Sequence, residues 1–128
     1  MHVHTCISHS SDKLLKELGK IRGSEYGLQS HLSENPEEVE WVRKLCPDSL
    51  GYLDAYDKRE CLHKSRFSAV MAHCVYSDES EMKLLKDRDV FVAHCPQSNI
   101  CLSSGIAPVR KFLDNGIKVG LGSDIAAG

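Results

Sequence analysis

Short apolar segments alternate with segments of helical character along this chain, and that alternation limits the folds open to it. The strand candidates are residues 27–32, 68–73, 90–93 and 117–121. The helix candidates are residues 11–22, 36–45, 77–87 and 106–115. Helices between strands favour parallel pairing through right-handed crossovers, so the sequence predicts an α/β fold. Residues 46–66 are expected to be irregular, with a short helix near 57–62.

Two architectures satisfy this pattern. A four-stranded open sheet is one of them. Half of a (β/α)8 TIM-type barrel is the other, because a whole barrel takes about 250 residues. Capping residues mark the expected helix ends: Ser10 or Ser11 for the first helix, Asn35 for the second, Ser77 for the third and Gly116 at the end of the fourth.

Composition indicates one ordinary globular domain over residues 1–128, with 41% hydrophobic residues. The net charge of −2 gives no electrostatic reason to expect nucleic acid or an anionic membrane as a partner. The apolar runs are far shorter than the roughly 20 residues of a membrane span, and no secretory signal is visible. Residues 1–9 are expected to be a disordered or atypical start.

The six cysteines form no Cys-x-x-Cys pair. We interpret them as reduced thiols of a cytoplasmic protein, with a disulfide framework as the alternative. The ligand spacing of a zinc finger is absent.

Each strand candidate ends near a potential ligand: His31, His73, His94 and Asp124. Functional residues of parallel α/β folds gather at the carboxyl ends of strands. A single histidine in such a place is usually structural. Four such residues, each about one βα unit from the next, indicate a shared site.

The residue types at these strand ends suit metal-assisted hydrolysis. His31 offers an imidazole ligand for zinc, and Glu34 can move a proton between an activated water and a leaving group. Asp124 can complete a metal shell and hold the attacking water, or it can cap a following helix. His73 can stabilise developing negative charge, or it can be a buried structural histidine. A mixed histidine and carboxylate shell favours Zn²⁺, although iron fits similar ligands.

Three further histidines are weaker candidates. His94 has two interpretations, and the sequence favours neither. Either the loop that follows it would contact substrate, or His94 only orders that loop. His2 and His4 form a His-x-His pair, but no apolar segment precedes them and the sequence favours no ligand role.

The motifs resemble those of the guanine deaminases, within the amidohydrolase superfamily. The matching stretches are QSHLSEN at 29–35, EEV at 37–39, AYDK at 55–58, VMAHC at 70–74, AHCPQSN at 93–99, LSSG at 102–105 and GLGSD at 120–124. This resemblance implies barrel strands 5–8 with their helices. It also implies zinc-dependent deamination of guanine to xanthine and ammonia, and full-length relatives that are homodimers.

The resemblance also implies roles for individual residues. His31 and Asp124 would bind zinc, Glu34 would shuttle the proton and His73 would assist at the reacting carbon. Glu34, His73 and Asp124 are therefore the expected catalytic residues, and these three with His31 would line the substrate site.

The chain departs from the family pattern in two places. The His-x-His of the family's first strand lies upstream of the matching region. The family's Pro-Arg-Phe, which holds the purine, is replaced by residues such as His4, Thr5 and Cys6. We therefore expect a fragment that is inactive alone. The alternatives are another aminohydrolase of the superfamily, for an adenosine-type or triazine substrate, and a non-catalytic half-barrel interaction module.

Overall fold

The computed structural model describes residues 2–4, 7, 10–22, 25–63 and 66–125, without the side chains of residues 2–4 and 22. In this part of the chain, five strands run parallel in one sheet, in the order of the sequence. The strands are β1 (His2–His4), β2 (Gly27–Leu32), β3 (Val70–His73), β4 (Phe91–His94) and β5 (Val119–Leu121). Parallel neighbours joined in sequence order through helices form an arc of a (β/α)8 barrel, so the predicted fold class is confirmed.

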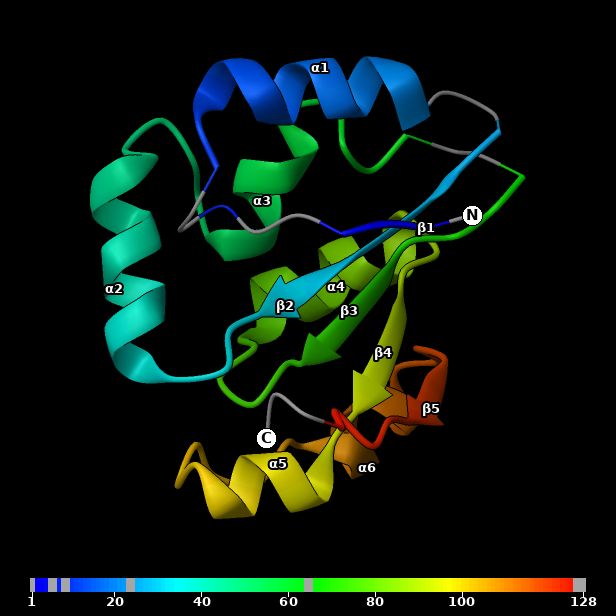
Figure 1. Ribbon diagram of the computed structural model, residues 1–128. Helices are drawn as coiled ribbons and strands as arrows, with labels where there is room; N and C mark the ends of the chain where they lie inside the picture. Colours follow the sequence, from blue (N-terminus) through cyan, green and yellow to red (C-terminus); the bar gives the residue numbers. More distant parts are fainter. Residues whose placement is uncertain (1, 5–6, 8–9, 23–24, 64–65, 126–128) are drawn as a thin grey trace.

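Helices connect and cover the strands (Figure 1). They are α1 (Asp12–Arg22), α2 (Pro36–Leu45), α3 (Tyr52–Asp57), α4 (Glu79–Asp87), α5 (Pro96–Cys101) and α6 (Val109–Asp114). Figure 1 shows α4 behind the sheet and α5 beneath the arrowheads of the strands. None of the described helices is long and apolar enough to cross a membrane.

Side-chain caps begin three of these helices. Ser11 Oγ accepts the N–H of Leu14 at 3.2 Å, as the sequence predicts for α1. Asn35 Oδ1 accepts the N–H of Glu38 at 2.8 Å and caps α2, also as predicted. The cap of α4 is Asp78 rather than the predicted Ser77, because the Asp78 carboxylate lies three residues before the N–H of Glu81 and accepts it at 2.8 Å.

The start of the chain contains a strand that the sequence did not indicate. Residues 1–9 were expected to be disordered or atypical, and of the residues described there His2–His4 form β1 and Ile7 is buried. Backbone pairing to the edge of β2 makes this strand, with His2 opposite Gly27 and His4 opposite Gln29. A strand this short has no apolar alternation to reveal it in the sequence. Residues 1, 5, 6, 8 and 9 lie outside the described residues.

Two helices also differ from the sequence prediction. The short helix expected near 57–62 lies at Tyr52–Asp57, where four of its side chains are buried. Helix α5 occupies Pro96–Cys101, a stretch that we predicted as loop. Its buried members are Ser98 and Asn99, so it has no apolar face that periodicity could detect.

The buried core lies between the sheet and the helices. Its largest fully buried side chains include Tyr56, Phe112, Leu28, Leu32, Leu53 and Met71. Tyr56 fixes α3 against β2: its hydroxyl lies 2.5 Å from Ser30 Oγ and accepts the N–H of Ile7 at 3.2 Å. Strands β2 and β3 pair in the register in which Leu32 lies opposite His73, which brings their carboxyl ends together.

Candidate active site

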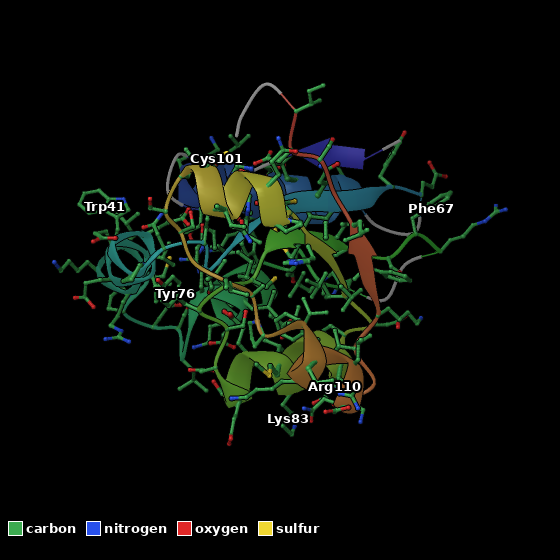
Figure 2. All side chains as sticks on the ribbon, turned by 90° about the horizontal axis from the view of Figure 1, so that it is seen from below. Trp41, Phe67, Tyr76, Lys83, Cys101 and Arg110 are labelled. Carbon is green, nitrogen blue, oxygen red and sulfur yellow. The ribbon has the colours of Figure 1, made fainter. Side chains whose placement is uncertain are left out.

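The carboxyl-terminal edge of the sheet gathers four side chains that the sequence predicts as site residues. His31 and His73 lie at the ends of β2 and β3, and Glu34 and Asp124 lie just after β2 and β5. Figure 2 looks onto this edge and shows α5, marked by the label of Cys101, lying across it. Because every strand is parallel, residues from distant parts of the sequence meet at this one edge.

His73 lies at the centre of the cluster. Its ring meets the ring of His31 edge to face, with the centroids 5.1 Å apart. Its Nδ1 lies 3.8 Å from Glu34 Oε1, and its Nε2 lies 3.9 Å from Asp124 Oδ2. The His73 side chain is 1% exposed, whereas the Glu34 and Asp124 side chains are 14% and 16% exposed. The site therefore has a buried imidazole, with a partly exposed carboxylate on each of two sides.

Left-handed backbone recurs at this edge. Ser33, His73 and Asp124 have φ values of 46°, 73° and 49°. L-residues adopt this region infrequently, and it is enriched at functional sites. His73 is the last residue of β3, Ser33 directly follows β2, and Asp124 lies three residues after β5.

Residues of α5 and the turn after it contact three of the four site residues. Ser98 Oγ donates to Asp124 Oδ2 at 2.6 Å. Asn99 Oδ1 lies 2.8 Å from His73 Nδ1. Ser104 Oγ donates to Glu34 Oε1 at 3.1 Å. The sequence indicated no individual role for these residues, because serine and asparagine are common in loops. Only the fold brings them to the site.

Glu81 supports the site from α4. It is 7% exposed, and it accepts hydrogen bonds from Ser33 Oγ at 2.8 Å and from the N–H of Leu53 at 3.0 Å. Burial raises the pKa of the Glu81 carboxyl, and these hydrogen bonds oppose that rise without cancelling it. In the sequence Glu81 resembles an ordinary acid in the first turn of a helix, so no signal distinguished it.

Two cysteines lie beneath the same edge. Burial raises the pKa of the Cys95 thiol and raises that of the Cys74 thiol well above its usual range, with nearby acidic groups acting in the same direction. Cys46, Cys61 and Cys101 are also free thiols, and Cys6 lies outside the described residues. High thiol pKa values suit inert packing residues and argue against thiolate chemistry at Cys74 and Cys95.

The donor set fits a metal ion. His31, Glu34 and His73 each offer one ligand atom, and these atoms lie within 4.8 Å of one another. His73 Nε2 is buried without a hydrogen-bond partner among the described residues, and Asp124 lies beside it. A buried polar atom without a partner is uncommon in a folded protein, so this nitrogen is suited to an ion or a substrate atom. Imidazole nitrogens with carboxylate oxygens are ligands that zinc accepts.

The three weaker histidine candidates, His94, His2 and His4, lie in strands. His94 ends β4, and its carbonyl accepts the N–H of Gly122 at 2.9 Å. It does not belong to the metal-ligand group found among the described residues, and its Nδ1 is buried without a partner there. His2 and His4 lie in β1, and their side chains are outside the described part of the chain.

The whole chain matches one known protein family. The model of the amidohydrolase family matches residues 1–128. The mouse protein named guanine deaminase is 42% identical over 119 residues, which cover 92% of this chain and 26% of that protein. The chain therefore spans about a quarter of the length of this curated relative.

Solved structures agree in fold. The guanine deaminase of C. acetobutylicum, solved with guanine bound in its active site, has a TM-score of 0.86 and is 43% identical. The match covers 93% of this chain and 28% of that one. The E. coli guanine deaminase has a TM-score of 0.89 and is 35% identical, over 95% of this chain and 28% of that one.

Proposed function

We propose, from the premise that this chain belongs to the amidohydrolase family, that it forms part of a guanine deaminase. The reaction adds water to guanine and releases ammonia, leaving xanthine. The observation that carries the proposal is the meeting of His31, Glu34, His73 and Asp124 at one edge of the sheet. The likeness to proteins named guanine deaminase supports guanine as the substrate.

Each side chain has a distinct proposed role. Asp124 orients the attacking water through its partly exposed carboxylate. Glu34 takes a proton from that water and delivers it to the departing amino group. His73 assists at the reacting carbon, as the likeness to the guanine deaminases implies. The water oxygen replaces the amino nitrogen on the ring carbon. One proton of the water leaves with that nitrogen as ammonia, and the other stays on the ring of xanthine.

We propose His31 and Asp124 as ligands of a zinc ion in the same site. A bound zinc ion supplies Lewis acidity, which lets water act as a nucleophile near neutral pH. The close grouping of His31, Glu34 and His73 supports an ion at this position, and Asp124 lies beside His73. Iron remains a second candidate by ligand chemistry.

The activity is proposed for the whole gene product, because this chain spans about a quarter of the curated relative it matches. The partner that we propose is a small purine, with no nucleic acid, and the full-length protein is proposed to be a homodimer. We place it in the cytoplasm, where the free thiols of the described cysteines would stay reduced.

The test is a substrate panel on the full-length native protein, with product formation followed by chromatography. Guanine, adenosine and a triazine are compared. We expect zinc-dependent formation of xanthine and ammonia from guanine. A preference for adenosine or the triazine would replace guanine as the assigned substrate. If none of the three is turned over, the assignment of aminohydrolase activity is wrong.

A substitution separates the chemistry from folding. Glu34→Gln keeps the shape of the side chain and removes its ability to carry a proton, so kcat should fall by about 10²–10⁴-fold. Glu37→Gln is the matched control, because Glu37 is an exposed acid in the first turn of α2. Equal activity of Glu34→Gln and the wild type would remove Glu34 from the mechanism.

A further inference from the structure

We propose that residues 98–104, the second half of α5 with the turn after it, act as a positioning segment for the active site. Three of its side chains each hold one different site residue: Ser98 holds Asp124, Asn99 holds His73 and Ser104 holds Glu34. This proposal rests on the proposed function, since it assigns these residues to the geometry of that reaction. None of the three is given a role at the reacting atoms.

The burial of these side chains is the first argument. Ser98, Asn99 and Ser104 are 1%, 0% and 5% exposed. Burying a hydroxyl or an amide costs free energy unless it is hydrogen-bonded. The segment directs the two hydroxyls and the Asn99 amide oxygen onto site residues. The Asn99 amide nitrogen is buried without a hydrogen-bond partner among the described residues, so apolar side chains would fill these positions at less cost. The arrangement therefore serves orientation of the site more directly than it serves stability.

The backbone joins the three contacts into one unit. The carbonyl of Asn99 accepts the N–H of Ser104 at 2.8 Å and that of Gly105 at 3.4 Å, which closes the turn on the end of α5. Ser104 is thereby fixed relative to Asn99, and Ser98 precedes Asn99 in the same helix. A displacement of the segment would move the partners of Asp124, His73 and Glu34 together.

Asn99 also selects the tautomer of His73. An amide oxygen only accepts hydrogen bonds, so Nδ1 of the neutral His73 ring carries the proton at the 2.8 Å contact. The lone pair then lies on Nε2, which is buried beside Asp124 and has no hydrogen-bond partner among the described residues. Asn99 is therefore a positioning residue that presents Nε2 of His73 to the site.

The backbone conformation makes such support necessary. His73 and Asp124 both lie in the left-handed region, which persists only when neighbouring contacts hold it. Asn99 contacts the first of these residues and Ser98 the second. The segment thus supports the left-handed conformation of both His73 and Asp124.

The test uses Asn99→Leu in the full-length native protein, because leucine has a similar size and no acceptor. A group that orients a residue of the active site typically contributes about 10–100-fold to activity. We therefore expect kcat of Asn99→Leu to fall by about that factor, with KM changed less than about twofold. Gln97→Ala is the matched control, since Gln97 is exposed on the same helix. A wild-type kcat in Asn99→Leu would overturn the proposal.

A second readout does not depend on activity. In the metal-free protein with ¹⁵N-labelled histidine, at a pH where the ring is neutral, His73 should show the Nδ1–H tautomer in the wild type. Asn99→Leu should lose that preference, and an unchanged tautomer would contradict the role of Asn99. This measurement still decides the proposal if the wild type has no deaminase activity, which would reject only the proposed function.

Ser98→Ala provides a variant that removes one hydroxyl and little else. A crystal structure should show the Asp124 carboxylate turned away from its wild-type position, with kcat lowered by about 10-fold or more. This variant replaces Asn99→Leu if the latter fails to fold. An Asp124 carboxylate in its original place with unchanged kcat would overturn the positioning role of Ser98.

Discussion

At the scale of single residues, strained backbone and buried polar atoms coincide at one edge of the sheet. Ser33, His73 and Asp124 are left-handed, and each contacts a polar side chain from another element. Left-handed residues other than glycine cost of order 1–3 kcal/mol each, and they persist where neighbours hold them in place. The hydrogen bonds to Glu81, Asn99 and Ser98 are contacts of that kind.

Gly122, between β5 and Asp124, has a steric reason to lack a side chain. A Cβ there would lie 2.8 Å from Cys95 Sγ and 3.7 Å from Ala93 Cβ. We predict that Gly122→Ala destabilises the full-length protein by about 1–3 kcal/mol through overpacking, measured by chemical denaturation. Because Asp124 follows two residues later, the same substitution should also lower kcat.

Two variants test this explanation. Adding Cys95→Ala removes the clashing sulfur, so the double variant should recover most of the loss caused by Gly122→Ala. Gly120→Ala is the control, because nothing lies within 4 Å of its added Cβ. If Cys95→Ala gives no recovery, the contact with Cys95 is not the cause.

At the scale of elements, Glu81 connects three parts of the fold. It lies in α4, accepts from Ser33 after β2 and accepts from the N–H of Leu53 in α3. One carboxylate therefore ties the turn that carries Glu34 to two helices behind it. Asp78, which begins α4, adds to the rise in the Glu81 pKa as a nearby negative charge.

The raised pKa of Glu81 predicts a pH dependence of stability. The folded protein binds the Glu81 proton more tightly than the unfolded chain does, so this group lowers the free energy of unfolding as pH rises from about 4.5 to its raised folded pKa. Glu81→Gln lacks this effect. The stability of the wild type relative to Glu81→Gln should therefore fall with rising pH over that interval.

Urea unfolding of both full-length proteins between about pH 4.5 and 7 measures this difference. Glutamine can still accept from the N–H of Leu53 and donate to Ser33 Oγ, so the substitution changes the charge more than the contacts. A difference between the two proteins that is constant or grows with pH would contradict the prediction.

Elements differed in how well the sequence predicted them. Helix α2 was predicted closely, because Asn35 and Pro36 mark its start and the apolar Val42 lies on its buried face. Helix α5 was missed, because its buried residues are polar. Strand β1 was missed because backbone pairing with β2, and no apolar pattern, defines it.

At the scale of the whole molecule, apolar side chains are exposed at and just after β5, an edge strand of the described sheet. Leu121 in β5 is 85% exposed, and Ile125 after it is 86% exposed. Strand β5 pairs only with β4 among the described strands. Exposed apolar side chains at a strand edge with no partner among the described strands favour association.

This arrangement predicts the behaviour of the 128-residue chain expressed alone. We expect it to form concentration-dependent oligomers by light scattering. We also expect no deamination of guanine with added zinc, because the chain matches only 26% of the length of its curated relative. The full-length protein is the control. Zinc-dependent turnover by the isolated chain would show that these residues suffice for the site, and would point to His2 and His4 or to oligomeric completion.

The sequence by itself determined the α/β class, the parallel order of four of the strands and the candidate side chains at their ends. These depend on apolar periodicity and on residue type, which are local properties. Tertiary structure alone brought Ser98, Asn99, Ser104 and Glu81 to the site and set the left-handed strand ends. Those features depend on contacts between residues 26 to 70 positions apart, and no local pattern in a sequence encodes such contacts.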